Sequence, residues 1–182
     1  SHSISAITPQ EKDVSTQIVG SDVRYVFTGW NDGSALTIRT IELNSNLSFT
    51  AAFDKEFKLE TATQPAGIIQ INGAGWYRDG ETIALNTDPV EGYSFLYWLV
   101  NGVKVGESST IEFIVDEPTA VEAVYNSLPT ISLEDREVSR GEVLELLLSE
   151  HSEDKDGDTL SYSLVSGTGN ISGGTYSVDT SE

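Results

Sequence analysis

The chain has 182 residues, and its 29 acidic and 10 basic side chains give a formal net charge of −19 at pH 7. No basic patch is present, which makes nucleic acid and anionic membrane surfaces poor partners. The chain also has no cysteine, so disulfides and thiolate chemistry are excluded, and no run approaches the roughly 18 apolar residues that predict a membrane-crossing helix.

The first clearly predicted strand, RYVFTGW at residues 24–30, carries a tyrosine, a phenylalanine and a tryptophan. Asp32-Gly33 follows it and is a dipeptide typical of hairpin turns. Residues 47–54 then alternate apolar and polar side chains, which is the period of a half-buried strand. Together these elements predict a small β-sheet module.

The same elements return later in the chain. GYSFLYW at residues 92–98 repeats the three aromatics at the same spacing, Asn101-Gly102 repeats the turn, and residues 119–126 repeat the alternating strand. TIEL at 40–43 and TIEF at 110–113 form a further matched pair. Because self-similarity of this kind is the signature of a repeat protein, we predict two copies of one β module.

The second copy also has a front half. It comprises a predicted strand at 67–73, a glycine-rich turn, the aromatic pair Trp76-Tyr77, an Asp79-Gly80 turn and a further strand. In the first copy, residues 3–7 stand where 82–85 stand in the second. We therefore expect the chain to begin inside a repeat and its first sheet to lack a strand or expose an edge.

The pattern changes from residue 127 onward, where neither tryptophan nor an aromatic triplet occurs. Strands are predicted at 130–133, 143–149, 160–165 and 175–178. The segment GEVLELLLSEH is the best helix candidate of the chain, but its alternate leucines also share one face of a strand, and we interpret it as a strand. A full immunoglobulin-like sandwich has about 100 residues, so this last module is expected to be incomplete.

The predicted fold class is therefore all-β, a tandem of small β modules. The length suits two or three small domains. We place a partial aromatic repeat at 1–57, a complete aromatic repeat at 58–126 and an immunoglobulin-like module at 127–182.

Several longer stretches carry a resemblance to known families. GWYRDGETIAL, GYSFLYWLVNG and TAVEAVYN in the second copy, with RYVFTGWNDG and LSFTAAFD in the first, resemble the divergent internalin-type B-repeats of bacterial surface proteins over about residues 3–126. LPTISL, GEVLELLLSE and EDKDGDTLSYSL make residues 127–182 similar to cadherin-like and immunoglobulin-like extracellular repeats. Both resemblances imply non-catalytic β modules displayed in series outside the cell.

Trp76 and Tyr77 are the candidate ligand-binding residues. Neighbouring side chains on a strand point to opposite faces, so at least one of the two is expected to reach the surface. An exposed aromatic ring can stack on a sugar ring, which makes glycan binding one interpretation. The other interpretation is that both rings pack against the open end of the module.

The candidate metal ligands are Asp154, Asp156 and Asp158 in the stretch EDKDGD. Oxygen ligands at alternate positions, with Gly157 for the tight turn, can wrap a hard cation such as calcium. An EF-hand is excluded, because the twelfth position of the loop is Val165 and not glutamate. A calcium site completed by further ligands and a solvated acidic turn both remain open.

Catalytic motifs are not found. The chain has two histidines, no GxSxG elbow and no dinucleotide-binding fingerprint. With 29 acidic residues, a pair of neighbouring carboxylates carries no weight as a sign of hydrolase chemistry. We predict that the chain is not an enzyme, and calcium is the one candidate cofactor that the sequence offers.

The resulting functional prediction is a structural, spacer or adhesion segment of a large secreted or cell-surface prokaryotic protein. Expected partners are cell-envelope or extracellular components, glycans or neighbouring copies, without membrane insertion. Two alternatives belong to other classes: an accessory, glycan-binding module of an extracellular hydrolase, and a subunit of a surface layer or filament.

Overall fold

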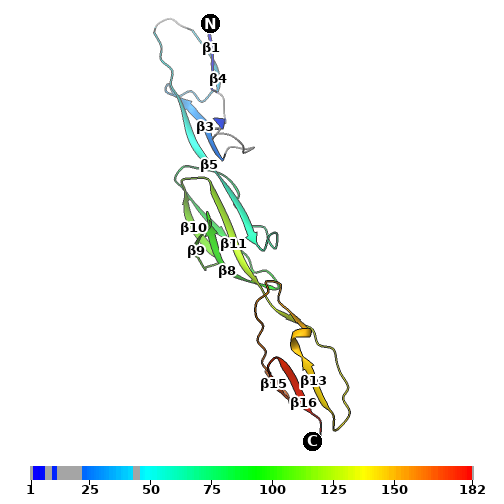
Figure 1. Ribbon diagram of the computed structural model, residues 1–182. Helices are drawn as coiled ribbons and strands as arrows, with labels where there is room; N and C mark the ends of the chain where they lie inside the picture. The colour runs from blue at the N-terminus through cyan, green and yellow to red at the C-terminus, as the bar shows by residue number, and fades with distance from the viewer. Residues whose placement is uncertain (1, 7–9, 12–21, 43–45, 182) are drawn as a thin grey trace. The chain divides into compact units, whose positions relative to one another are not determined.

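Strands make up nearly all of the regular structure in the computed structural model, which describes residues 2–6, 10–11, 22–42 and 46–181 (Figure 1). Within these residues there is no α-helix, which confirms the all-β prediction. None of the described elements is a helix of the length and apolarity that a membrane crossing requires. The chain divides into two units, Ser1–Asp88 with Phe95–Val124 and Pro89–Ser94 with Tyr125–Glu182.

The aromatic copies contain a main sheet and two ribbons. The main sheet has the order β2-β3-β5-β11-β8-β9, with β6 also paired to β5, and the ribbons are β1–β4 and β7–β10. The strands are β1 (His2–Ser5), β2 (Gln10–Glu11), β3 (Val23–Trp30), β4 (Ile38–Ile41), β5 (Ala51–Gln64), β6 (Gly75–Arg78), β7 (Glu81–Asn86), β8 (Tyr93–Val100), β9 (Val103–Gly106), β10 (Thr110–Val115) and β11 (Thr119–Ser127).

Strand β5 belongs to both copies. Its residues 51–57 pair antiparallel with β3, and its residues 59–64 pair in parallel with residues 119–124 of β11. The chain thus stays in one strand where we predicted the boundary between residues 57 and 58. The division into three modules is not tested by this strand and stays a prediction.

The front half of the second copy differs from the prediction. Residues 67–73, expected as a strand, form bends and turns, and Gly67 and Gly73 have positive φ values of 78° and 120°. The first strand of the second copy is instead the end of β5, where Phe57 and Leu59 are buried and Lys58 and Glu60 are more exposed. This alternation was available in the sequence, and the glycines at both ends of 67–73 argue against a strand there.

The core of the second copy lies on one face of the main sheet. Leu59, Val121 and Trp98 are 1%, 1% and 0% exposed, and Ile83 and Leu85 of the β7–β10 ribbon are also buried. Burying a tryptophan removes a large apolar surface from water, which is the main stabilising contribution available to a small module without disulfides. The aromatic pattern of the sequence therefore serves the core.

The two copies place their tryptophans in the same way. Trp30 Nε1 donates to the carbonyl of Leu36 at 2.8 Å, and Trp98 Nε1 donates to the carbonyl of Ser108 at 2.9 Å. The phenylalanine three residues before each tryptophan lies 5.6 Å and 5.5 Å from it between ring centroids. The repeat predicted from the aromatic spacing is thus also seen in the contacts of the phenylalanine and tryptophan rings, which are the same in both copies.

An asparagine after each tryptophan ties two strands together. Oδ1 of Asn31 accepts from the N–H of Thr50 at 3.1 Å, and the N–H of Asn31 donates back to the carbonyl of Thr50 at 2.9 Å. Asn101 makes the same two bonds with Ala120, both at 2.8 Å. Asn101 adopts a φ of 48°, in the left-handed region that asparagine tolerates better than most residues.

The two ribbons also correspond, but with a different match from the one predicted. Ser5 faces Ile38 in β1–β4, and Asn86 faces Thr110 in β7–β10. The two copies are aligned by the residue after the carbonyl that each tryptophan reaches: the Thr37 carbonyl accepts from the N–H of Ala6, and the Ser109 carbonyl accepts from the N–H of Thr87. On this alignment the predicted matches of 3–7 with 82–85 and of TIEL with TIEF are each wrong by two residues. The cause is the longer β8–β9 hairpin, since the carbonyl that Trp98 reaches lies 10 residues further along the chain, against 6 for Trp30.

The second unit contains a three-stranded sheet of order β13-β16-β15 and a short β12–β14 pair. Its elements are β12 (Thr130–Ile131), β13 (Val143–Leu147), the 3-10 turn η1 (Leu148–Glu150), β14 (Ser152–Glu153), β15 (Asn170–Ser172) and β16 (Thr175–Asp179). The segment GEVLELLLSEH thus forms a strand, as predicted, that ends in a single tight turn.

The strands predicted for the second unit differ from those in the structure. Residues 160–165 are in no strand, although their side chains alternate in character, because no described strand pairs with them. Tyr162 instead shares a hydrogen bond with Ser152 at 2.6 Å. The prediction also missed the two-residue β14 and missed β15, which forms a hairpin with β16 through Gly173 and Gly174, both at positive φ. A glycine pair between short β-prone stretches is a hairpin signal that would have found β15.

The unequal burial of the two tryptophans predicts unequal stability effects. Trp98 is fully buried, whereas Trp30 is half-buried. Replacing a buried tryptophan by alanine costs about 3–5 kcal/mol, so we expect Trp98→Ala to lose that amount and Trp30→Ala clearly less. Urea unfolding followed by circular dichroism measures both losses, and equal losses would contradict the expectation.

Candidate functional site

The predicted aromatic pair lies on β6 and its two rings have different surroundings. Tyr77 is half-buried, and its hydroxyl donates to the carbonyl of Gly73 at 2.7 Å. Its ring also lies beside Gly75, where an added Cβ would meet it at 3.7 Å. Tyr77 therefore holds the turn before β6 and is not placed to meet a ligand.

Trp76 lies on the outer face of the sheet, opposite Lys58 of β5. The guanidinium of Arg24 lies 4.5 Å from its ring centroid. Arg24 is itself fixed to Glu56, with Nε to Oε2 at 2.7 Å and Nη2 to Oε2 at 2.6 Å. A cation over an indole ring is attracted by the negative face of the ring, so this pairing holds both side chains in place.

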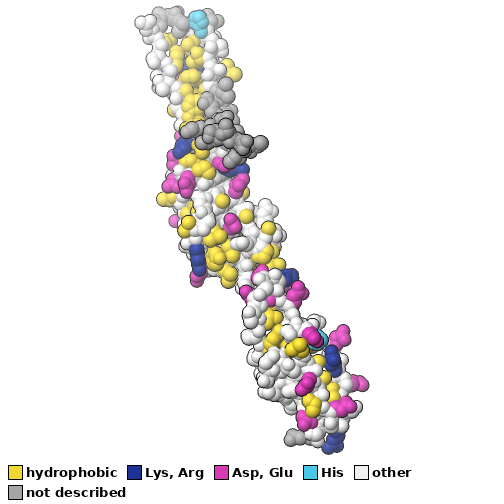
Figure 2. Space-filling view, in the orientation of Figure 1, with side chains coloured by type: hydrophobic (Ala, Val, Ile, Leu, Met, Phe, Trp, Pro, Cys, Tyr) yellow, Lys and Arg dark blue, Asp and Glu magenta, His cyan; other side chains and the backbone are white. Residues whose placement is uncertain are grey.

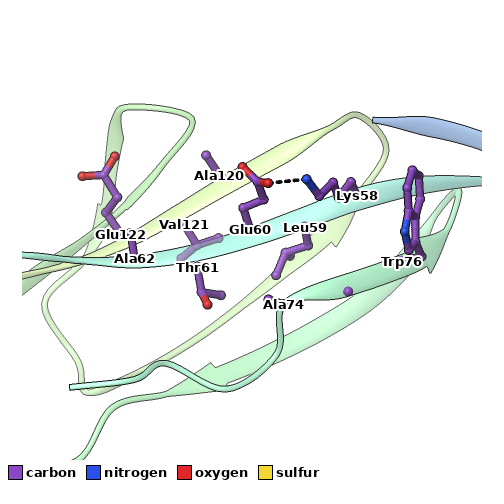
Figure 3. A pocket seen from close by; sticks show the side chains of 11 residues that line it. Lys58, Leu59, Glu60, Thr61, Ala62, Ala74, Trp76, Ala120, Val121 and Glu122 are labelled. Carbon is purple, nitrogen blue, oxygen red and sulfur yellow. Dashed lines mark hydrogen bonds and ion pairs between the residues drawn. The ribbon is translucent and has the colours of Figure 1, made fainter. Parts of the chain in front are cut away.

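Trp76 also lines a shallow hollow of about 550 Å³ on this face (Figure 3). Figure 3 shows Trp76 at one end of the row of lining side chains and Glu122 at the other, with the ion-paired Lys58 and Glu60 between them. Small side chains leave the space: Ala62 on β5, Ala120 on β11 and Ala74 just before β6.

The chemistry available in the hollow is binding chemistry. It offers one aromatic ring, two glutamates and one lysine. The only hydroxyl among its lining residues is that of Thr61, which donates to the carbonyl of Ile71 at 2.8 Å. Rings and carboxylates of this kind suit a hydroxyl-rich ligand, which they would stack against and accept hydrogen bonds from.

The acidic stretch EDKDGD forms a turn held by hydrogen bonds among its own residues. Oδ1 of Asp154 accepts from the N–H groups of Asp156 and Asp158 at 3.0 and 3.2 Å. The N–H of Gly157 donates to the carbonyl of Asp154 at 3.2 Å, and the φ of Gly157 is 78°. A residue with a side chain is strained at that φ, so the glycine is needed for the turn.

Asp156 has a second role inside the same unit. Its carboxylate accepts hydrogen bonds from both the N–H and the hydroxyl of Ser127, the latter at 3.1 Å. Ser127 is only 2% exposed. Because buried polar groups are costly when unpaired, Asp156 supplies the partner that this serine needs.

The three aspartates are close in sequence but do not converge on one point. Within the described residues, no group of three histidine, aspartate or glutamate side chains could hold a metal ion. Asp154 serves the turn, and Asp156 serves Ser127. The calcium site stays a prediction, and the structure assigns two of its three proposed ligands to other contacts.

The acidic character seen in the sequence is spread over the surface. On the face shown in Figure 2, acidic side chains are scattered along both units, and lysine and arginine lie in small groups between them. Several of the cations are paired, such as Arg39 with Asp32, where Nη2 to Oδ2 is 2.6 Å. The guanidinium of Arg39 holds the pKa of Asp32 below its usual value.

Comparison with known families supports part of the resemblance seen in the sequence. Residues 59–129 match the family model of the divergent InlB B-repeat domain. The matched stretch begins in the second half of β5 and contains the second copy from Leu59 onward. No curated protein and no solved structure matches the chain. The likeness of residues 127–182 to cadherin-like repeats is not tested and stays a prediction.

The contact between Asp156 and Ser127 gives a direct test of what the acidic turn does. Asp156→Ala leaves two buried donors of Ser127 without a partner, so we expect a loss of about 1–3 kcal/mol in the free energy of unfolding. Urea unfolding in the presence of EGTA measures this loss in the absence of calcium.

Asp158→Ala in the same turn is the matched control, and its expected effect is within about 0.5 kcal/mol. A loss for Asp156→Ala that appears only when calcium is present would contradict the structural role and support the metal site.

Proposed function

We propose that this chain is a non-catalytic, load-bearing repeat segment of a bacterial cell-surface protein. The B-repeat match of residues 59–129 supports the surface-repeat part of the proposal. The load-bearing part is carried by one observation, the parallel pairing of β5 with β11.

In the second copy, the strand that enters the module and the strand that leaves it are parallel neighbours. They are joined in register from Leu59↔Thr119 to Gln64↔Val124. Tension applied at residue 59 and at residue 124 pulls these strands in opposite directions along their length. The hydrogen bonds of a parallel ladder are evenly spaced, so under such shear they share the load and must break together.

The connection between the two copies is also suited to carrying tension. β5 runs without interruption from the first copy into the second, and each of its halves is paired to a neighbour (Figure 1). A flexible linker would absorb extension at low force, whereas a paired strand transmits it. This arrangement favours a segment that keeps other parts of a protein at a fixed distance.

The proposed setting is outside the cell, with cell-envelope or extracellular components as partners. A net charge of −19 favours solubility. Neither the match nor the fold names a ligand, and the spacer role requires none.

A second candidate function rests on the hollow beside Trp76. An aromatic ring at one end, with Glu60 and Glu122 further along the hollow, is what a glycan-binding groove needs, and this would make the segment an adhesion or accessory module. Arg24 already covers part of the ring, so stacking would take place on the surface that the indole turns to the hollow.

The load-bearing proposal predicts direction-dependent strength. The chain has no cysteine, so introduced cysteines give unique handles. Glu60→Cys with Asn126→Cys loads the β5–β11 ladder in shear, whereas Ala66→Cys with Asn126→Cys peels it from one end. We expect a clearly higher unfolding force for the first pair in single-molecule force spectroscopy. Equal forces for both pairs would contradict the proposal.

The adhesion candidate predicts that Trp76→Ala abolishes binding to an array of neutral and acidic oligosaccharides. Tyr97→Ala is the matched control, because Tyr97 also has a cation over its ring, Lys104 Nζ at 4.6 Å, but does not line the hollow. If the unaltered chain binds no oligosaccharide, or both variants lose binding equally, the hollow is not a glycan site.

A further inference from the structure

The two copies differ at one edge of their equivalent strands. Asn31 bonds to Thr50 as Asn101 bonds to Ala120, so residues 49–54 correspond to residues 119–124. In the second copy, β11 has β8 on one side and the end of β5 on the other. In the first copy, β3 covers one side of residues 51–54.

The opposite side of these residues has no described strand on it. β3 and β6 both pair with Glu56 and Phe57, so they lie on opposite edges of β5. β6 reaches only residues 56–59. We call the β6-side edge of residues 49–54 the open edge; among the described residues no strand pairs there.

Burial also differs between the two copies. Trp98, Ala123 and Val121 are 0%, 0% and 1% exposed, whereas their counterparts Trp30, Phe53 and Ala51 are only half-buried. In the second copy, Leu59 and Thr63 from the parallel strand are themselves buried at 1% and 6% exposed. No described residue takes their place in the first copy.

The half-buried side chains of the first copy include four aromatic rings. Phe27 lies 5.7 Å from Phe53, and Trp30 lies 6.4 Å from Phe49, in edge-to-face arrangements. Hydrophobic side chains reach the visible surface along this copy (Figure 2). An unpaired strand edge beside an apolar surface is a template for pairing with another strand.

We infer that the open edge is a docking surface for the parallel strand of another B-repeat. The occupant is a segment with the character of residues 59–64, which has an apolar side chain at the first position and small, inward-facing threonines after it. This choice follows from the chain itself, because β11 already accepts such a strand in parallel at the equivalent edge. The inference concerns assembly of repeats and does not depend on the load-bearing role.

The ribbon register defines a fusion that tests the inference. Ser5 corresponds to Asn86, so a residue placed directly before Ser1 corresponds to Glu81. A second copy of residues 57–81 joined in front of Ser1 therefore supplies the docking strand, the turn region and the β6 equivalent at the spacing of the second copy. The full chain is otherwise unchanged.

Hydrogen exchange read by mass spectrometry gives the result, with residues 119–124 as the internal reference. In the fusion, exchange of residues 49–54 should slow to the level of residues 119–124, while exchange in the unfused chain stays faster. Unchanged exchange at residues 49–54 in the fusion would overturn the inference.

A variant of the fusion separates pairing from mere proximity. Ala62→Pro in the added segment removes a backbone N–H in the middle of the docking strand and should restore fast exchange. Equal protection with and without the proline would overturn the inference.

Discussion

The structure of the aromatic copies depends on one strand having different partners along its length. The first half of β5 closes the first copy against β3, and its second half opens the second copy against β11 and β6. The two copies therefore share β5, which is paired in the sheet of both. A module built in this way does not have a boundary in the usual sense, because cutting the chain between copies removes a paired strand from one of them.

Small polar contacts make this architecture repeatable. The tryptophan N–H reaches a carbonyl across the following turn, and the asparagine after the tryptophan bridges to the last strand of the copy. Burial of an aromatic ring is not directional, whereas these hydrogen bonds fix where each tryptophan ring lies. Together, these contacts explain why the spacing of Tyr, Phe and Trp is the same in both copies, while the hairpin after the tryptophan differs in length.

At both candidate sites, the contacts in the structure differ in part from what the residue spacing suggested. Three aspartates at alternate positions around a glycine match a calcium loop in spacing, yet Asp154 bonds to its own turn and Asp156 to Ser127. Adjacent aromatics predicted that the two rings would face different ways. In the structure, Tyr77 holds the turn before β6. Trp76 lies beside the hollow, and the guanidinium of Arg24 covers part of its ring.

The sequence by itself determined the all-β class, the existence of two aromatic copies and the change of pattern after residue 126. These features are recorded locally, in the alternation of side chains and in the repeated spacing of Tyr, Phe and Trp, and local periodicity is the information a sequence carries most directly. The tertiary structure alone decided the two-residue offset between the copies, the sharing of β5 and the pairing of Asp156 with Ser127. Each of these joins residues far apart in the chain, such as Leu59 with Thr119, through backbone or side-chain bonds that leave no periodic trace in the sequence.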